Sequence, residues 1–247
     1  MIGVPARHDG GPVPAAHPTS PMSSPLQAVV FDFDGLVIDS ELVIYEMAAG
    51  AFAAHGHELT MEAWAAGVGV SGEEADAWWP AICEAAGAEG FALEDFEAAY
   101  RAQARDLDAI PLMPGVTELL KALHYEGVPC GVASSSNREW LVRHTTRFGL
   151  TSYFQTLVGA DVVGGRGKPA PDVYLRALED LGADPARSVA LEDSAHGAAA
   201  AKAAGMAVVA VPSELTRHND FSHVDLVVST LLDVDVELLE SLVAARD

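Results

Sequence analysis

Short apolar segments alternate with helical segments along most of the chain, and this alternation restricts the possible folds more than any other feature. Each apolar segment has the length of one strand, and the apolar residues between these segments recur at helical spacing. The expected strands are residues 27–33, 128–134, 154–161, 188–193, 207–213 and 224–228. Since parallel strands are joined by helical crossovers, the sequence predicts an α/β fold, a Rossmann-like doubly wound parallel sheet covered on both faces.

One long stretch interrupts the alternation directly after the first expected strand. From Ser40 to about Asp108 the sequence reads as helical, with breaks at glycines near residues 56, 67–72 and 87–90. A segment of this length is best explained as an insertion that forms a small domain of its own. We therefore predict an α-helical cap domain at residues 41–108 and a Rossmann-like core made of residues 26–40 and 109–247.

The composition limits the partners and the location of the chain. Its 247 residues include 14 Lys or Arg and 36 Asp or Glu, a formal net charge of −22, which argues against nucleic acid and an anionic membrane surface as partners. No apolar run is long enough to span a bilayer. Residues 1–25 are rich in Pro, Gly, Ala and Ser and lack the pattern of a secretory signal, so we expect a disordered tail. The two cysteines are expected to be reduced and buried, and the chain to be cytoplasmic, a monomer or weak homo-oligomer.

Polar residues suited to chemistry stand where three of the expected strands end. Asp32 and Asp34 end the first strand, Ser134–Ser136 end the second, and Glu192-Asp193 end a later one. Lys168 lies in a glycine-rich loop ahead of a helix. Each of these residues alone is also explained as a helix cap or a loop residue. Because the carboxyl ends of parallel strands lie at one edge of the sheet, however, the sequence predicts that they converge.

Four segments, taken in this order, resemble the signature motifs of one enzyme superfamily. They are "DFDGLVIDSE", "VASSSN", "GKPAPD" and "LEDSAHG", and the motifs run from residue 32 to residue 193. The set is similar to the four motifs of the haloacid dehalogenase superfamily, and more narrowly to its branch of β-phosphoglucomutase and sugar-phosphate phosphatases. The helical insert also stands where this branch has its cap domain.

The resemblance implies a nucleophile and a metal ion. Asp32 would attack phosphorus and form an aspartyl-phosphate, and Mg²⁺ would be bound by Asp32, Asp193 and the main-chain carbonyl of Asp34, with Glu192 holding metal-bound water. All these ligand atoms are oxygens, as a hard cation requires. A carboxylate and a phosphate dianion also repel one another, so Mg²⁺ and the Lys168 ammonium would supply the charge that lets them meet.

The resemblance also implies how the substrate is held and protonated. Asp34 would protonate the leaving oxygen and then accept a proton from the hydrolytic water, as general acid and then general base. The phosphoryl oxygens would be bound by the following groups: Lys168, the hydroxyls of Ser134 and Ser135, and the main chain at Phe33 and Gly35. Glu41, at the start of the cap, could bind substrate hydroxyls.

A phosphatase and a mutase share this chemistry, and the cap favours the phosphatase. In β-phosphoglucomutases a histidine stands ten residues after the acid–base aspartate, whereas this chain has Ile44 there. Residues 41–108 contain 14 Asp or Glu, no Lys, and only Arg101 and Arg105 as arginines. A second phosphate would therefore meet an acidic cap. We predict hydrolysis of a small, neutral, polyhydroxylated phosphate monoester, with the mutase as the alternative.

Two further alternatives concern the fold and the cap. A phosphorylation-dependent receiver domain also has carboxylates and a lysine at strand ends, but it needs neither a helical insert nor a second aspartate two residues after the first. In the cap, the aromatic residues Phe52, Trp64, Trp78 and Trp79 are expected to form its core, with at most one of them lining a substrate pocket.

Overall fold

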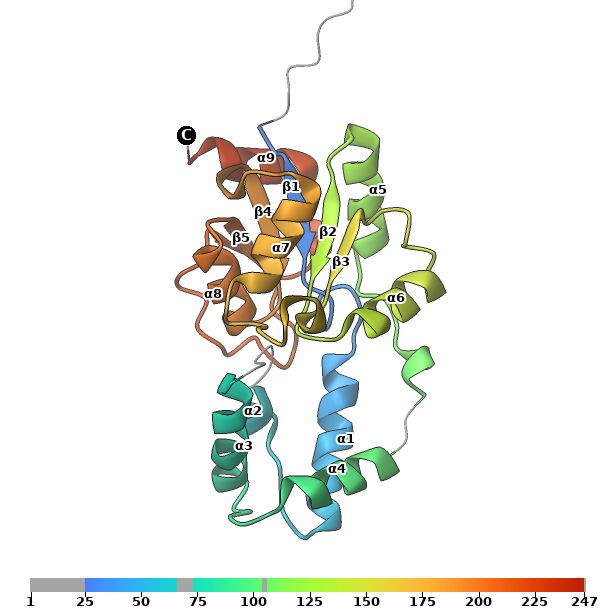
Figure 1. Cartoon of the computed structure of the whole chain (residues 1–247), viewed down its shortest axis with the longest axis vertical. Helices are drawn as coiled ribbons and strands as arrows, with labels where there is room; N and C mark the ends of the chain where they lie inside the picture. The colour runs from blue at the N-terminus through green and yellow to red at the C-terminus, as the bar shows by residue number, and fades with distance from the viewer. Residues whose placement is uncertain (1–24, 66–72, 104–105, 247) are drawn as a thin grey trace, which may run out of the picture.

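A computed structural model describes residues 25–65, 73–103 and 106–246 of the chain. Its centre is a six-stranded parallel sheet with the strand order β3-β2-β1-β4-β5-β6 (Figure 1). The strands are β1 (Ala28–Phe31), β2 (Cys130–Ala133), β3 (Thr156–Val158), β4 (Ser188–Glu192), β5 (Ala207–Ala210) and β6 (Leu226–Val227). This order is that of a doubly wound sheet, so the predicted fold class is confirmed. The predicted tail lies outside the described residues except for Pro25.

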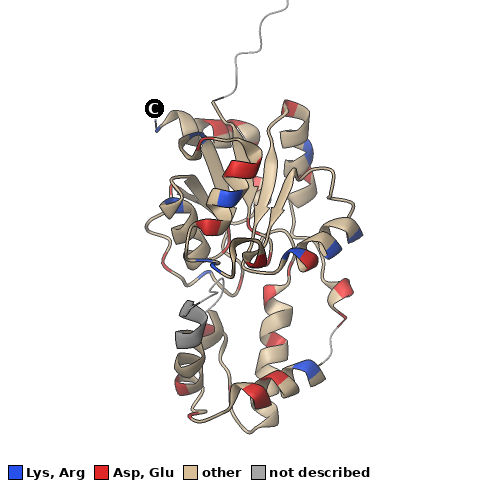
Figure 2. Cartoon of the chain, in the orientation of Figure 1, with Lys and Arg blue, Asp and Glu red and all other residues tan. Residues whose placement is uncertain are grey.

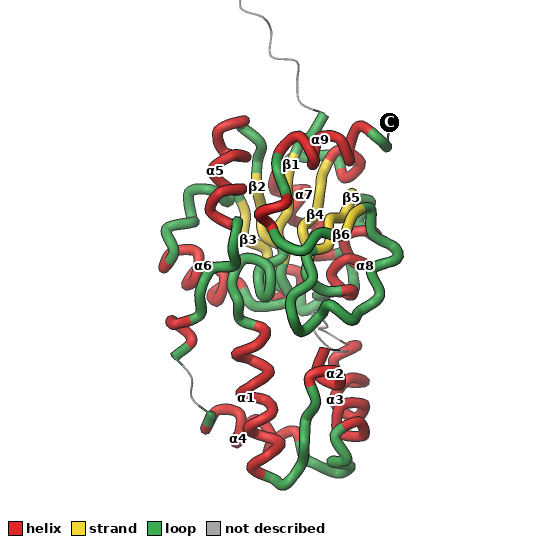
Figure 3. The backbone as a smooth tube through the Cα atoms, turned by 180° about the vertical axis from the view of Figure 1, so that it is seen from behind, coloured by secondary structure: helices red, strands yellow, loops and turns green. Residues whose placement is uncertain are grey.

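Helices cover both faces of the sheet, as the views from the two sides show (Figures 1 and 3). Successive residues of a strand point to opposite faces, and in β1 Val29 and Phe31 join one apolar cluster while Val30 joins another. The first cluster takes residues from α5 (Val116–Glu126), α6 (Arg138–Arg147) and α9 (Val236–Ala244), and the second from α7 (Asp172–Leu181) and α8 (Ala195–Ala203). Short 3₁₀ turns occur at Leu107–Ala109, Ala160–Val163, Pro185–Arg187 and Leu231–Asp233.

The strand expected at residues 154–161 is shorter in the structure. β3 ends at Val158, and the chain then enters the 3₁₀ turn at Ala160–Val163. The amide of Ala160 donates to the carbonyl of Ser136, and a Cβ on Gly159 would lie 2.5 Å from that carbonyl oxygen. The main chain therefore leaves the sheet at Gly159 to bond with the loop after β2, which the local apolar pattern does not indicate.

The residues between β1 and α5 form helices that lie beyond the carboxyl edge of the sheet (Figure 1). These are α1 (Glu41–Ala54), α2 (Met61–Ala65), α3 (Glu73–Ala85) and α4 (Leu93–Ala102). They have an apolar cluster of their own, which includes Phe52 and Trp64, with Trp78 and Trp79 packed against it. The cluster accounts for the aromatic residues of the insert as core and supports the predicted cap, whose boundaries at 41 and 108 stay a prediction. We name residues 41–108 the cap and the rest of the described chain the core.

Two smaller expectations can be compared with the structure. Cys83 and Cys130 are buried free thiols, and burial raises the pKa of Cys130 to about 12, so this thiol stays protonated at neutral pH. Among the helices of the described residues, none combines the length and apolar character that crossing a membrane requires.

Candidate active site

Asp32 and Glu192 lie side by side at the carboxyl edge of the sheet. β1 and β4 are neighbours, with Phe31 opposite Leu191, and the amide of Asp32 donates to the carbonyl of Leu191 at 2.9 Å. Strand alternation turns Asp32 and Glu192 toward the face that α7 covers. Here the strand order reverses direction in sequence, which is the point where doubly wound sheets bind ligands.

Lys168 stands between these two carboxylates. Its Nζ lies 2.5 Å from Asp32 Oδ1 and 2.5 Å from Glu192 Oε1, and the side chain is only 1% exposed. Burial lowers the pKa of Lys168, but the charges of Asp32 and Glu192 outweigh burial and raise it above its usual value. The buried ammonium is therefore charged and held in place by two acids.

Glu192 has no oxygen left for a further partner in this arrangement. Its Oε1 accepts from Lys168 and from the Tyr174 hydroxyl at 2.5 Å, while Oε2 accepts from the amide and the hydroxyl of Ser194, at 3.3 and 3.1 Å. Gly197, one turn into α8, leaves room for the carboxylate, because a Cβ there would lie 1.9 Å from Glu192 Oε1. Glu192 thus orients Lys168 and the start of α8.

Asp193 differs from Glu192 in the hydrogen bonding of its carboxylate. Both of its carboxylate oxygens are buried and, among the described residues, neither has a hydrogen-bond partner. Gly35, at φ 82°, makes the approach possible, since a Cβ there would lie 2.2 Å from Asp193 Oδ2. Leaving a buried carboxylate unpartnered costs free energy unless a ligand compensates it.

A divalent cation fits this position. Asp32, Glu192 and Asp193 each offer a carboxylate oxygen, and these atoms lie within 4.8 Å of one another. Because the oxygens of Glu192 already accept from protein donors, Asp32 and Asp193 are the available acids. Glu192 was expected to hold metal-bound water, whereas in this arrangement its oxygens accept from Lys168, Tyr174 and Ser194 instead. Oxygen ligands suit a hard ion such as Mg²⁺.

The carboxylates around this position hold protons unusually tightly. Burial and the charge of Glu192 raise the pKa of Asp32 to about 7, although Lys168 works against them. Burial, Asp34 and Asp32 raise the pKa of Glu41 to about 8, and burial and Asp32 raise that of Asp193 well above its usual value. Negative charge is therefore concentrated where a cation would relieve it.

These shifts predict how the stability of the metal-free protein depends on pH. The folded state binds protons more tightly than the unfolded chain does, so its free energy of unfolding should fall as pH rises from about 4 to about 8. Mg²⁺ replaces those protons and should raise the midpoint of thermal unfolding by about 5 °C more at pH 8 than at pH 5.5. Asp193→Asn should reduce this difference. An equal effect of Mg²⁺ at both pH values would contradict the cation site.

Asp34 points into a different set of donors. Its Oδ1 accepts from Ser40 Oγ at 2.8 Å and from Trp140 Nε1 at 2.9 Å, and its Oδ2 accepts from Ser136 Oγ at 2.7 Å and Ser134 Oγ at 3.4 Å. Ser40 precedes α1 without capping it by its side chain, because its hydroxyl is used here instead. The carboxyl is thus bound from the residue that precedes α1, from the loop after β2 and from α6.

Two adjoining cavities open on these groups. The first, of about 230 Å³, is lined by Asp32, Asp34, Glu41, Ile44, Ser134, Ser135, Ser136, Lys168, Asp193 and Ser194. The second, of about 500 Å³, shares Asp34, Ile44, Ser135 and Ser136 with the first and adds Tyr100, Leu107, Asn137, Trp140 and Asp161. The first has the scale of a phosphoryl group with its ligands, and the second can receive the rest of a small substrate.

The structure brings together nearly all of the predicted site residues. Phe33 is an exception in its side chain, which is fully buried in the apolar core, so only its main chain can face a ligand. The amide of Gly35 already donates to the carbonyl of Ile38, at 2.9 Å. The contribution of these two residues to phosphate binding stays a prediction, whereas the close approach of Gly35 to Asp193 is a contact that the prediction did not include.

Several residues of the site were given no role of their own from the sequence, among them Ser136, Trp140, Tyr174 and Gly197. Ser136 stands in the polar run after the second strand, and Gly197 in the last of the four motifs, so a local signal exists for both. For Trp140 and Tyr174 the only local signal is a position in the first or second turn of a helix that begins near the sheet edge. Both are aromatic residues whose hydrogen bonds reach another element.

Comparison with known proteins identifies the family of the chain. Residues 29–211 match the model of the haloacid dehalogenase-like hydrolases. The putative phosphatase YhcW of Bacillus subtilis is 32% identical over 214 residues, covering 87% of this chain and 96% of that protein. Hexitol phosphatase B of Escherichia coli K12 is 32% identical over 223 residues, covering 86% and 97%.

A solved structure agrees with these relatives. CbbY of Rhodobacter sphaeroides, in complex with phosphate, superposes with a TM-score of 0.66 at 26% identity, covering 84% of this chain and 96% of that one. The chain therefore belongs to the haloacid dehalogenase-like hydrolase family, in the branch of β-phosphoglucomutase and sugar-phosphate phosphatases that its four motifs predict.

Proposed function

We propose that the protein is a Mg²⁺-dependent phosphatase that hydrolyses a small sugar or polyol phosphate through an aspartyl-phosphate intermediate. The observation that carries this proposal is the pairing of Asp32 with Lys168, beside the unpartnered carboxylate of Asp193, in a cavity of about 230 Å³. This pairing places a nucleophilic oxygen next to one cation and next to the acids that fit a second.

The first half of the reaction forms the intermediate. Lys168, Ser134 and Ser135 bind phosphoryl oxygens, together with the main-chain amide of Phe33; the amide of Gly35 would have to leave the carbonyl of Ile38 to join them. An oxygen of Asp32 bonds to phosphorus while the bond from phosphorus to the leaving oxygen breaks, and that oxygen takes a proton from Asp34. Mg²⁺, held by Asp32, Asp193 and the main-chain carbonyl of Asp34, would offset the negative charge of the phosphate and the nucleophile.

The second half restores the enzyme. Asp34, now ionised, accepts a proton from a water molecule, whose oxygen bonds to phosphorus as the bond to Asp32 breaks. Phosphate leaves and Asp34 is protonated again. Glu192 takes no part in bond making, since its oxygens hold Lys168, Tyr174 and Ser194. Glu41, in the first cavity, is available to bind a hydroxyl of the substrate.

The charge of the cap supports a phosphatase over a mutase. Among the described residues of the cap, Arg101 is the only Lys or Arg, and it pairs with Glu97 on α4 (Figure 2). Ile44 lines both cavities, at the position where β-phosphoglucomutases have a histidine. A second phosphate would therefore find little positive charge there, whereas neutral hydroxyls would not be repelled. The relative named hexitol phosphatase B points to the same class of substrate.

The proposal also covers the partners, the cellular location and the oligomeric state of the protein. A formal net charge of −22 supports a small-molecule substrate without nucleic acid or membrane as partner. Two buried, unpaired cysteines support a reducing, cytoplasmic location. The proposed oligomeric state is a monomer or a weak homo-oligomer.

Measurement of phosphate release from a panel of esters tests this proposal. With Mg²⁺, hexose and hexitol monophosphates should be hydrolysed with kcat/KM at least about tenfold above those of sugar bisphosphates and nucleotides. EDTA should abolish release and added Mg²⁺ should restore it. Faster conversion of β-glucose 1-phosphate to glucose 6-phosphate than to free phosphate would establish the mutase instead, and full activity in EDTA would overturn the mechanism.

A further inference from the structure

The carboxyl group of Asp34 accepts hydrogen bonds from serine hydroxyls and from one indole N–H. These donors differ in how they respond when a proton moves onto or off the carboxyl group. Ser134 and Ser136, which face Oδ2, are hydroxyls and can donate or accept as the proton moves. The indole N–H of Trp140, which faces Oδ1, can only donate. The indole N–H therefore favours Oδ1 as the unprotonated oxygen, because a carbonyl or carboxylate oxygen accepts a hydrogen bond better than the oxygen of a carboxyl O–H does, and the acidic proton is favoured on Oδ2.

The other oxygen is turned toward the reaction. Oδ2 of Asp34 lies 3.4 Å from the hydroxyl of Ser134 and 2.7 Å from that of Ser136, and both serines line the smaller cavity with Asp32 and Lys168. Ser40, on Oδ1, is fully buried just before the cap begins. The two oxygens thus have separate partners: Oδ1 is bound by Ser40 and Trp140, and Oδ2 by two serines that line the cavity of the nucleophile.

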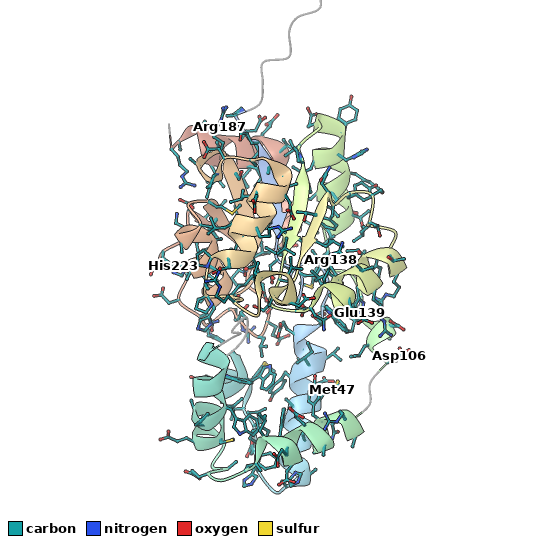
Figure 4. All side chains as sticks on the ribbon, in the orientation of Figure 1. Met47, Asp106, Arg138, Glu139, Arg187 and His223 are labelled. Atoms are coloured by element: carbon teal, nitrogen blue, oxygen red, sulfur yellow. The ribbon has the colours of Figure 1, made fainter. Side chains whose placement is uncertain are left out.

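Local structure explains why Trp140 can hold this position. Asn137 caps α6 by accepting from the amide of Trp140 at 2.9 Å, which sets the first turn of the helix. One turn later the buried ring of His144 packs against the indole, with the ring centroids 4.0 Å apart and the ring planes tilted by 56°. Figure 4 labels the neighbours Arg138 and Glu139, at the edge of the core that faces α1. The capped first turn of α6 and the ring of His144 together hold the indole where its N–H reaches Asp34.

We propose that Trp140 is a positioning residue for the acid–base group: its indole N–H fixes the orientation of Asp34 so that Oδ2, not Oδ1, delivers the proton. This rests on the proposed function. As the oxygen of Asp32 bonds to phosphorus, the bond from phosphorus to the leaving oxygen breaks, and the proton on Asp34 Oδ2 passes to that oxygen. The products are an alcohol, the aspartyl-phosphate and an Asp34 carboxylate whose Oδ1 still accepts from Trp140.

The dependence of the rate on the leaving group tests this role. An alkoxide, as in a hexitol 6-phosphate, needs a proton to leave, whereas p-nitrophenolate leaves readily without one. For Trp140→Phe, which keeps an aromatic ring and removes the N–H, kcat/KM should fall about tenfold more with hexitol 6-phosphate than with p-nitrophenyl phosphate. Asp34→Asn should show the same selectivity to a greater degree. Because both substrates are assayed on one preparation, any misfolded fraction cancels from the ratio.

A matched control removes an indole N–H that has no partner. Trp78 Nε1 is buried and, within the part of the chain that the structure describes, makes no hydrogen bond, so Trp78→Phe should leave the ratio of the two substrates unchanged. If Asp34→Asn is selective and Trp140→Phe is not, the role of Trp140 is wrong while the proposed function stands. If Asp34→Asn lowers both substrates equally, the acid–base role of Asp34 fails, and the inference fails with it. Should Trp140→Phe be insoluble, Trp140→Leu must give the same selective loss.

Discussion

Replacing Asp32 with asparagine should lower phosphate release at least about a thousandfold, because the amide cannot form the covalent intermediate. The change is nearly isosteric, and Lys168 can still donate to the side-chain oxygen. It also removes a carboxyl whose pKa burial and Glu192 raise to about 7, so the free energy of unfolding should not fall by more than about 1 kcal/mol. The measurement is steady-state phosphate release with Mg²⁺, beside thermal unfolding of the same preparation.

A matched control for this variant is Asp233→Asn, an equal chemical change at an exposed position in the turn Leu231–Asp233. It should retain the activity of the parent within about twofold. Incubation of the parent with substrate, followed by acid quenching and peptide mass analysis, should find phosphate on the peptide with Asp32. Activity of Asp32→Asn within tenfold of the parent, or phosphate on another residue, would rule out Asp32 as the nucleophile.

Replacing Lys168 with methionine should reduce both activity and stability. Lys168 is the cation between Asp32 and Glu192, each 2.5 Å from its Nζ, so its loss leaves two buried carboxylates facing one another. Breaking a buried pair in this way costs about 3–5 kcal/mol. Phosphate release should fall at least about a thousandfold, because the phosphoryl oxygens lose their nearest protein cation. Because protonation of Asp32 relieves the repulsion, the loss of stability should be smaller at about pH 5.5 than at pH 8.

Lys202→Met provides the comparison for this second variant. Lys202 pairs with Asp225 at 2.9 Å, but both side chains are partly exposed to solvent, at 32% and 28%. The loss of a partly exposed pair should cost no more than about 1 kcal/mol and leave activity unchanged. Equal destabilisation by the two lysine substitutions would show that Lys168 does not compensate the buried carboxylates in solution. Retention of more than a tenth of the activity by Lys168→Met would contradict its role in phosphate binding.

Much of the fold and of the site follows from local patterns. Each strand carries its own apolar signal, and the acids after β1 and in β4 are placed by strand alternation once the strands are parallel neighbours. The length of β3 was not predicted, because the chain leaves the sheet at Gly159 to bond with Ser136, a contact made by another loop. Edge strands have one neighbour only, so such contacts easily end them.

The amino-acid sequence was enough to predict the parallel sheet, the inserted helices and the convergence of Asp32, Lys168 and Asp193 at the carboxyl edge of the sheet. Strand and helix periodicity are properties of neighbouring residues, so they can be recognised in the sequence itself. The hydrogen-bond partners of these site residues depend instead on how the helices pack on the sheet. Tyr174 on Glu192 and Trp140 on Asp34 join residues 18 and 106 positions apart, and such bonds depend on how whole helices pack on the sheet. Packing brings these donors within reach, and burial then makes each hydrogen bond count, because water cannot replace it.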